Sequence, residues 1–250
     1  MDSSPDLSVV IACYNEACHI KQSLPKLAQV LEKTGLTVEF IVIDDCSRDG
    51  TPAILDELLA DLKPSRLTVH TTNVGRGGTV AEGFRQARGK VVGYLDIDLE
   101  VDPWYILPLL EKMDREKLDG VIAHRIYKID AHPTVLIRQL TSIGFRKLSH
   151  MFLKLPVTDS AGGFKFFRRE AIAPVVEQCQ SKHWFWDTEL VFIAIRMNLS
   201  IGEIPVLFLR RPEKKSTVRL IPDTIRHFRE MFQLLKRYPG QVDDTTGAKS

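Results

Sequence analysis

The sequence has no long apolar run, no paired cysteines and no large net charge. No stretch of its 250 residues approaches the roughly 18 consecutive apolar residues that a membrane-spanning helix needs. The four cysteines include no C-x-x-C pair, which argues against zinc and dithiol redox motifs, so we expect four buried thiols in a reducing compartment. A formal net charge of +2 gives no overall field of the kind that marks a nucleic-acid-binding protein.

The first residues also lack the features of a secretory signal. They read "MDSSPDLSVV", with an acidic rather than a basic start and only a short apolar run, unlike a signal peptide. At 44% hydrophobic and 26% charged residues, the composition is ordinary for a globular protein. We therefore expect a cytoplasmic globular protein that binds no nucleic acid.

What the first hundred residues do contain is a regular alternation of apolar runs and amphipathic segments. Strands are predicted at 7–12, 37–44, 67–72 and 91–98, and helices or turns into helices at 18–34, 47–62 and 73–90. This order predicts an α/β fold, a mostly parallel sheet with helices on both faces. Ligands of such sheets bind at the carboxyl ends of the strands, and the polar clusters of this sequence fall at those ends.

The second half predicts further elements of the same domain. Pro103 opens a helix, residues 119–128 form a strand, and residues 134–153 form a long amphipathic helix. A strand in "DSAGGFKFFRRE", a helix in "WFWDTELVFIAIRMN" and a strand in "IGEIPVLFLRR" follow. Because no Ser/Gly/Pro-rich linker and no repeat interrupts them, we predict one domain over residues 1–240 and a disordered tail at 241–250.

Three carboxylates end the fourth predicted strand, in "YLDIDLE". Asp96, Asp98 and Glu100 would share one face if the strand continues, because alternate residues of a strand point the same way. Packed carboxylates repel one another unless they are protonated or bind a cation. Oxygen ligands of this kind suit Mg²⁺ or Mn²⁺, which would in turn bind a diphosphate. The alternative is a solvated strand end with exposed acids.

A second acidic pair ends the predicted strand at 37–44. Asp45 is a candidate to accept hydrogen bonds from a nucleotide, because acids at this position of an α/β sheet often do so. The alternative is a helix N-cap, which we assign to Asp49. The nearby "NVGRGG" matches neither the dinucleotide fingerprint nor a Walker loop. It would either cradle phosphate with its backbone N–H groups or form a tight turn into a helix.

Six blocks of the sequence resemble, in this order, family 2 of the inverting glycosyltransferases. They are "VVIACYNE", "IVIDDCSRDGT", "NVGRGGTVAEGFRQARG", "LDIDLE", "DSAGGFKFFRRE" and "IGEIPVLFLRR". The resemblance runs from about Leu7 to Phe232 and is strongest to dolichyl-phosphate mannose synthases and related polyprenyl-phosphate sugar transferases. It implies a GT-A fold, a nucleotide-sugar donor (GDP-mannose or a UDP-hexose), a lipid-phosphate acceptor and Mg²⁺ or Mn²⁺.

The resemblance also assigns roles to particular residues. The nucleoside would be held by Ala12, Tyr14, Glu16, Ile43 and Asp45. The donor would also contact Asp96, Ile97 and Asp98, and its phosphates would bind Arg125 and Arg211. Asp98 and Glu100 would ligate the metal, and the catalytic set would be Asp96, Asp98, Arg125 and Arg211. Arg138 and Ser142, four apart on one helical face, match the pair that receives the acceptor's phosphate.

Departures from the family pattern leave the donor open. Ala12 replaces a common proline, Glu100 stands where mannose synthases often have Gln or Ser, and Thr217 falls where a phosphate-binding lysine is usual. Lys214 or Lys215 would then replace that lysine. GDP-mannose, UDP-glucose and a UDP-N-acetylhexosamine all fit the sequence as donors.

Two alternatives to lipid-phosphate transfer are also compatible with the sequence. Transfer to a saccharide or protein hydroxyl would need a general base, for which Asp159 and Asp187 are candidates. A non-catalytic nucleotide-sugar-binding module is the other. The basic amphipathic segments 134–153 and "DTIRHFREMFQLLKRY" predict peripheral contact with the cytoplasmic face of a membrane, the alternative being helices packed on their own domain.

Overall fold

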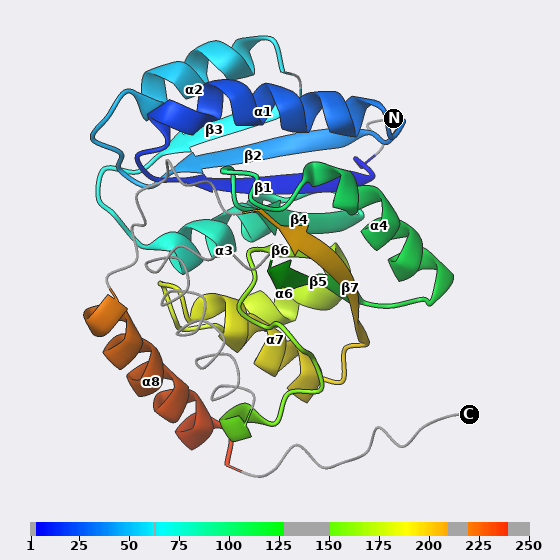
Figure 1. Cartoon of the computed structure of the whole chain (residues 1–250), viewed down its shortest axis with the longest axis vertical. Helices are drawn as coiled ribbons and strands as arrows, with labels where there is room; N and C mark the ends of the chain where they lie inside the picture. The colour runs from blue at the N-terminus through cyan, green and yellow to red at the C-terminus, as the bar shows by residue number, and fades with distance from the viewer. Residues whose placement is uncertain (1–3, 63, 128–150, 210–219, 240–250) are drawn as a thin grey trace.

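The computed structural model of the chain describes residues 4–62, 64–127, 151–209 and 220–239. In this part of the chain seven strands form one sheet in the order β3-β2-β1-β4-β6-β5-β7 (Figure 1). The strands are β1 (Leu7–Cys13), β2 (Val38–Asp44), β3 (Ser65–Val69), β4 (Val91–Leu95), β5 (Gly120–Tyr127), β6 (Phe164–Arg168) and β7 (Ile201–Phe208). β6 runs antiparallel to β4 and β5, whereas the other pairs are parallel. The predicted mostly parallel sheet is confirmed.

Helices cover both faces of this sheet, as predicted (Figure 1). They are α1 (Ala17–Glu32), α2 (Thr51–Ala60), α3 (Arg76–Gln86), α4 (Ile106–Arg115), α6 (Arg169–Val176), α7 (Trp186–Arg196) and α8 (Leu220–Arg237). The apolar sides of α1, α2 and α4 pack in one core, and those of α3, α6, α7 and α8 pack in the other. A 3₁₀ turn, η1 (Pro103–Tyr105), leads into α4 where the sequence predicts a helix opened by proline.

The inner strand β1, between β2 and β4, shows why its run "LSVVIAC" is almost wholly apolar. Val9 and Ile11 belong to one core and Val10 to the other, and all three are fully buried. Successive side chains of a strand point to opposite faces, so a parallel strand covered by helices on both sides needs apolar residues at every position. Close packing continues in β4, where a Cβ on Gly93 would lie 2.0 Å from the Phe166 ring.

Some expectations for the elements need correction. The third strand is Ser65–Val69 rather than 67–72. Cys13 is buried but Cys18 is exposed, so the four thiols are not all buried. Of the predicted helix at 134–153, residues 151–153 are helical and the remainder lies outside the described residues, as does the tail at 241–250. The single domain is confirmed, whereas its predicted bounds, 1–240, stay a prediction.

Candidate functional site

The loops that follow β1 and β2 are joined by hydrogen bonds at the carboxyl edge of the sheet. The backbone N–H of Asn15 donates to Ser47 Oγ at 2.8 Å, and the N–H of Arg48 donates to Asn15 Oδ1 at 2.9 Å. The N–H of Glu16 donates to Thr51 Oγ1 at 2.9 Å. The structure therefore brings together the two segments that the sequence assigns to nucleoside binding.

Within these segments the predicted nucleoside residues differ in their exposure. Ala12 and Ile43 are direct neighbours across β1 and β2, and the Ile43 side chain is fully buried. Tyr14, in the loop after β1, is 37% exposed. An aromatic ring exposed at this edge offers a face on which a base can stack, whereas Ile43 can only form the floor beneath it.

Asp45 lies directly after β2 and is almost fully buried. Its Oδ1 accepts the Val74 N–H at 2.8 Å and contacts His70 Nδ1 at 2.9 Å, and its Oδ2 accepts the Gly75 N–H at 2.9 Å. The backbone carbonyl of Asp45 accepts from Asn73 Nδ2 at 3.0 Å. The loop between β3 and α3 thus fixes the position of this carboxylate.

The same contacts favour one of the two interpretations of "NVGRGG". Val74 and Gly75 direct their N–H groups at Asp45, and the Gly78 N–H donates to the Lys182 carbonyl at 3.1 Å. Gly75 has a φ of 89°, and a Cβ there would lie 2.3 Å from that same carbonyl. These three amides are occupied within the protein, which favours a tight turn into α3 over a phosphate cradle.

The three carboxylates after β4 do not share one face, which corrects the prediction of a strand over 91–98. β4 ends at Leu95, and the Leu99 N–H donates to the Asp96 carbonyl at 3.1 Å with Leu99 at a φ of 52°. This turn leaves Asp96 exposed and buries Asp98. The Asp96 N–H still donates to the Gly163 carbonyl at 3.1 Å, one step beyond the last β4–β6 pair, and the strand ends where the turn begins.

Asp98 and Glu100 nevertheless stay close within the turn. The Asp98 Oδ1 accepts the Glu100 N–H at 3.2 Å. Ile97, between Asp96 and Asp98, is 2% exposed and belongs to the hydrophobic core. Its side chain therefore has a packing role, and a contact with a donor would come from its peptide group.

The described residues contain no group of three His, Cys, Asp or Glu side chains arranged to hold a metal ion. Mg²⁺ is usually bound by one or two carboxylates together with substrate phosphates rather than by a cage of protein ligands. Two hard oxygen donors in one turn, Asp98 and Glu100, fit that mode of binding. Their role as metal ligands stays a prediction.

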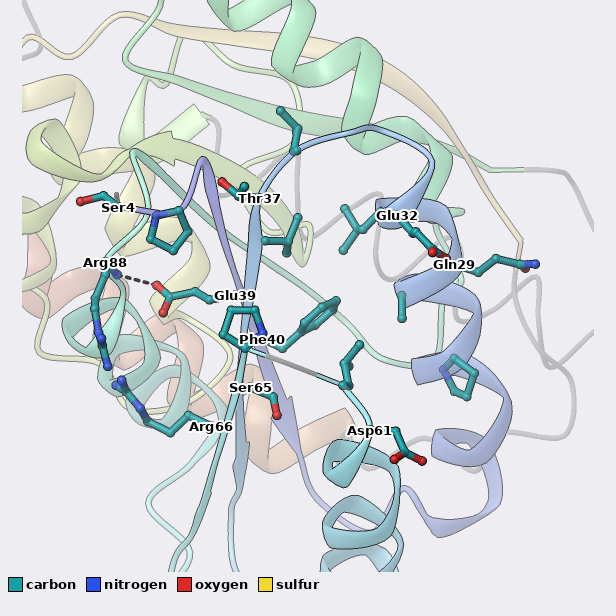
Figure 2. Close-up of a pocket in the computed structure, with 18 residues that line it drawn as sticks. Ser4, Gln29, Glu32, Thr37, Glu39, Phe40, Asp61, Ser65, Arg66 and Arg88 are labelled. Atoms are coloured by element: carbon teal, nitrogen blue, oxygen red, sulfur yellow. Dashed lines mark hydrogen bonds between the residues drawn. The ribbon is translucent and has the colours of Figure 1, made fainter. Parts of the chain in front are cut away.

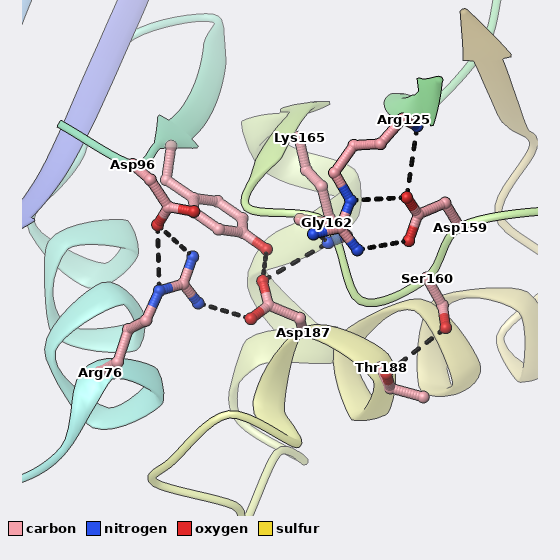
Figure 3. Close-up of polar contacts among 10 residues, drawn as sticks. Arg76, Asp96, Arg125, Asp159, Ser160, Gly162, Lys165, Asp187 and Thr188 are labelled. Atoms are coloured by element: carbon pink, nitrogen blue, oxygen red, sulfur yellow. Dashed lines mark hydrogen bonds and ion pairs between the residues drawn. The ribbon is translucent and has the colours of Figure 1, made fainter. Parts of the chain in front are cut away.

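Arg76, at the start of α3, is a site residue that the sequence reasoning missed (Figure 3). Its Nη2 lies 2.7 Å from Asp96 Oδ1, and its Nη1 lies 2.5 Å from Asp187 Oδ2. The guanidinium carbon lies 5.3 Å from the centre of the Trp184 ring. Gly163 leaves room for this pair, since a Cβ there would lie 2.1 Å from Asp96 Oδ2. A basic residue between glycines in "NVGRGG" was the available signal.

Three side-chain hydrogen-bond donors contact the buried carboxylate of Asp187, in the first turn of α7 (Figure 3). Besides Arg76, its carboxylate accepts from Tyr94 Oη and lies 3.4 Å from Lys165 Nζ. Burial raises the pKa of Tyr94, and the negative Asp187 raises it further. Burial lowers the pKa of Lys165 although Asp187 and Asp159 oppose that shift.

Arg125, near the end of β5, makes a two-pronged contact with Asp159 (Figure 3). Arg125 Nε lies 2.7 Å from Asp159 Oδ2, and Nη2 lies 2.9 Å from Oδ1. Burial opposes the charged form of Arg125, but the charge and hydrogen bonds of Asp159 outweigh it and raise the pKa of Arg125. Arg125 is therefore a fixed cation, held in place before any ligand arrives.

Neither candidate general base is placed to accept a proton. Asp159 is fully buried against Arg125, and Asp187 is 1% exposed and bonded to Arg76 and Tyr94. The remaining predicted residues, Arg138, Ser142 and Arg211, lie outside the described residues, together with Lys214, Lys215 and Thr217.

A pocket of about 1010 Å³ lies elsewhere, at the amino ends of the parallel strands (Figure 2). Thr37, Ser65 and Arg88 line it just before or at the start of β2, β3 and β4. None of the predicted site residues borders it. Since ligands of open α/β sheets bind beyond the carboxyl ends of the strands, we place the candidate site at the opposite edge.

Comparison with known proteins gives matches along most of the chain. Residues 8–175 match the model of the family described as "Glycosyl transferase family 2". Glycosyltransferase AglD of Haloferax volcanii is 31% identical over 222 residues, covering 88% of this chain and 35% of that protein. A dolichyl-phosphate beta-glucosyltransferase of Saccharomyces cerevisiae is 28% identical over 219 residues, covering 80% and 66%. A protein of the same name from Dictyostelium discoideum is 25% identical over 250 residues, covering 92% and 76%. This chain thus spans about a third of the first relative and just under two thirds of the second.

Solved structures with the same fold are more distant in sequence. Glucosyl-3-phosphoglycerate synthase from Mycobacterium tuberculosis, in complex with UDP, superposes with a TM-score of 0.69 at 16% identity over 93% of this chain and 80% of that one. S. aureus TarS, in complex with UDP-GlcNAc, superposes with a TM-score of 0.60 at 18% identity, over 92% of this chain and 66% of that one. The predicted GT-A fold is confirmed.

Proposed function

The chain belongs to glycosyl transferase family 2, and on that premise we propose that it transfers a hexose from a nucleotide-sugar to a polyprenyl or dolichyl phosphate. Two relatives carry the name dolichyl-phosphate beta-glucosyltransferase, which supports both the lipid-phosphate acceptor and glucose as the sugar. Two structural neighbours were solved with UDP or UDP-GlcNAc, which supports a uridine nucleotide. UDP-glucose is therefore the proposed donor, and mannose from GDP-mannose is the alternative.

The choice of a phosphate as the acceptor rests on the ion pairing of the two buried acids. Asp159 and Asp187 are both paired with arginines, so neither is available to deprotonate a hydroxyl. A phosphate monoester needs no such base, because its oxygens are anionic at neutral pH. This favours a lipid phosphate over a saccharide or protein hydroxyl as the nucleophile.

In the proposed reaction, an oxygen of the acceptor phosphate bonds to the sugar C1 from the face opposite the leaving group. The bond from C1 to the donor diphosphate breaks, and the nucleoside diphosphate leaves with the electron pair. Tyr14 and Asp45 would hold the nucleoside and Arg125, together with Arg211, the diphosphate. A cation in a water-poor site stabilises charge that develops on a leaving group.

Asp98 and Glu100 would hold Mg²⁺ or Mn²⁺ beside that diphosphate. Such an ion neutralises the charge of the departing oxygens. A neighbour of the same fold was solved with Mn²⁺, UDP and glucosyl-3-phosphoglycerate, which supports a divalent cation at this site. Arg138 and Ser142 would receive the acceptor phosphate, since an arginine fork with a hydroxyl suits a phosphate monoester.

We also propose peripheral contact with a membrane, where the lipid acceptor resides. In the part of the chain that the structure describes, none of the helices has the length and hydropathy to cross a bilayer. Apolar side chains are instead exposed on α8 and at residues 151–152, namely Met151, Phe152, Ile225 and Phe232. The rings of Phe152 and Phe232 lie 5.9 Å apart, and the cations Arg226 and Arg229 are exposed on the same helix. This combination suits an anionic membrane surface.

The test is product formation. The purified chain would be incubated with a short polyprenyl phosphate, Mn²⁺ or Mg²⁺, and UDP-glucose, GDP-mannose or UDP-N-acetylglucosamine in separate reactions, with lipid-phosphate-sugar detected by mass. We expect product from UDP-glucose that is lost in Asp98→Ala and in Arg138→Ala. Asp114→Asn is the matched control, because Asp114 forms an exposed ion pair with Arg168 on the α4 side of the fold.

Two results would overturn the proposal. Transfer to a free sugar or peptide hydroxyl without transfer to the lipid phosphate would restore the hydroxyl acceptor. UDP binding without turnover of any donor would favour a binding module. For the membrane contact, Phe232→Ser with Ile225→Ser should abolish flotation with anionic liposomes, and equal flotation of the variant and the unaltered chain would contradict it.

A further inference from the structure

His70 lies between two carboxylates at the edge of the proposed nucleoside site. It follows β3 directly, and its backbone N–H donates to the Asp44 carbonyl at 2.9 Å. The ring Nδ1 lies 2.9 Å from Asp45 Oδ1, and Nε2 lies 3.0 Å from Glu82 Oε2. The side chain is 11% exposed. The imidazole is thus fixed through its backbone and held at both nitrogens.

This geometry selects the protonation state of the ring. An ionised carboxylate only accepts hydrogen bonds, and a neutral imidazole carries a single N–H. Both contacts are hydrogen bonds only when His70 carries two protons. The charged groups that face it are Asp45, from the loop after β2, and Glu82, from α3. Burial alone would lower the pKa of His70, but hydrogen bonds and charge from these two acids raise it above 6.5.

The position of Asp45 depends on this contact. Val74 and Gly75 donate their N–H groups from one segment of the loop, and His70 supplies the one side-chain donor among the contacts described for this carboxylate. An ionised carboxylate offers about four acceptor positions, so Asp45 keeps capacity for a ligand. If the ring loses one proton, one of its nitrogens presents a lone pair to a carboxylate oxygen, which is repulsive.

We propose that doubly protonated His70 is a positioning residue that ties Asp45 to Glu82, so that the nucleotide binds most tightly while the ring carries both protons and more weakly once one is lost. The inference rests on the proposed nucleoside role of Asp45. The positive charge of the imidazolium also favours binding of the nucleotide. Without the imidazolium, two uncompensated carboxylates remain beside a site that must accept an anionic diphosphate.

The raised pKa of His70 sets the direction in which UDP affinity should change with pH. Because the site is proposed to bind the nucleotide most tightly while the ring carries both protons, UDP affinity should fall as pH rises through the pKa of His70. Since that pKa is raised above 6.5, we expect the fall above pH 6.5. The loss of one hydrogen bond to a charged group corresponds to roughly a tenfold fall in affinity.

The experiment is calorimetric titration of the full chain with UDP, and separately with GDP, across this pH range. The chain itself, His70→Phe and Glu82→Gln would be compared at each pH, because UDP also titrates in part of the range. We expect His70→Phe to bind more weakly at low pH and to lose the histidine-dependent fall. Glu82→Gln keeps the Asp45 contact but removes one charge, so its fall in affinity should move to lower pH.

A second readout keeps the test independent of folding defects. Titration of the His70 ring protons by NMR should give a midpoint above 6.5 in the unaltered chain and a lower one in Glu82→Gln. A UDP affinity profile that is the same in all three proteins, or a His70 midpoint below 6.5, would overturn the inference while leaving the proposed function intact. A folded chain that binds neither UDP nor GDP at any pH would overturn the proposed function, and the role of His70 with it.

Discussion

Replacing Asp187 by asparagine should destabilise the protein strongly, because this carboxylate compensates two cations in the interior. Arg76 Nη1 lies 2.5 Å and Lys165 Nζ 3.4 Å from its oxygens, and Lys165 is fully buried. Removing one partner of a buried ion pair costs about 3–5 kcal/mol, since it leaves an unpaired charge.

Two features place the expected cost at the lower end of that range. Arg76 keeps its contact with Asp96, and the already lowered pKa of Lys165 lets that amine lose its proton. A cost of about 3 kcal/mol corresponds to a fall in Tm of roughly 6–12 °C, at about 2–4 °C per kcal/mol for a chain of this size. Scanning calorimetry at neutral pH would measure it.

An exposed ion pair on α4 provides the control for the buried carboxylate of Asp187. Asp114→Asn removes an ion pair with Arg168 in which Asp114 is 75% exposed, so we expect a change of less than about 1 kcal/mol. If Asp187→Asn melts within about 2 °C of the unaltered chain, the buried network does not stabilise the fold. If it keeps its Tm and its UDP affinity but loses about 10²–10⁴-fold in kcat, Asp187 is a general base after all.

Three further substitutions test other parts of the molecule. Gly93→Ala would place a Cβ 2.0 Å from the Phe166 ring, and overpacking should cost about 1–3 kcal/mol, measurable by thermal unfolding. Asp45→Asn should weaken UDP binding about 10–100-fold by calorimetry, as expected for the loss of a charged acceptor, and unchanged affinity would remove Asp45 from the nucleoside site. Arg125→Lys breaks the two-pronged contact with Asp159 and should lower kcat by about 10²–10³-fold in the lipid-phosphate assay.

Much of the candidate site was predictable because the end of a buried strand can be recognised from a few neighbouring residues. The apolar runs at β1, β2 and β4 end at Tyr14, Asp45 and Asp96, and a parallel sheet must bring such ends to one edge. The hydrogen bonds between the loops after β1 and β2 agree with that expectation. Local chemistry also identified Asp98 and Glu100 as oxygen donors, although not the turn on which they lie.

Periodicity and composition act over a few residues, so they predict the α/β class, the order of strands and helices along the chain, and the end of the sheet at which polar residues lie. Which charges meet depends instead on tertiary packing. Arg76 and Asp187 are 111 residues apart, and the Asp96 N–H at the end of β4 donates to the carbonyl of Gly163, from a distant segment. Such contacts depend on how β6 and α7 pack against β4 and α3, and no local pattern records that packing.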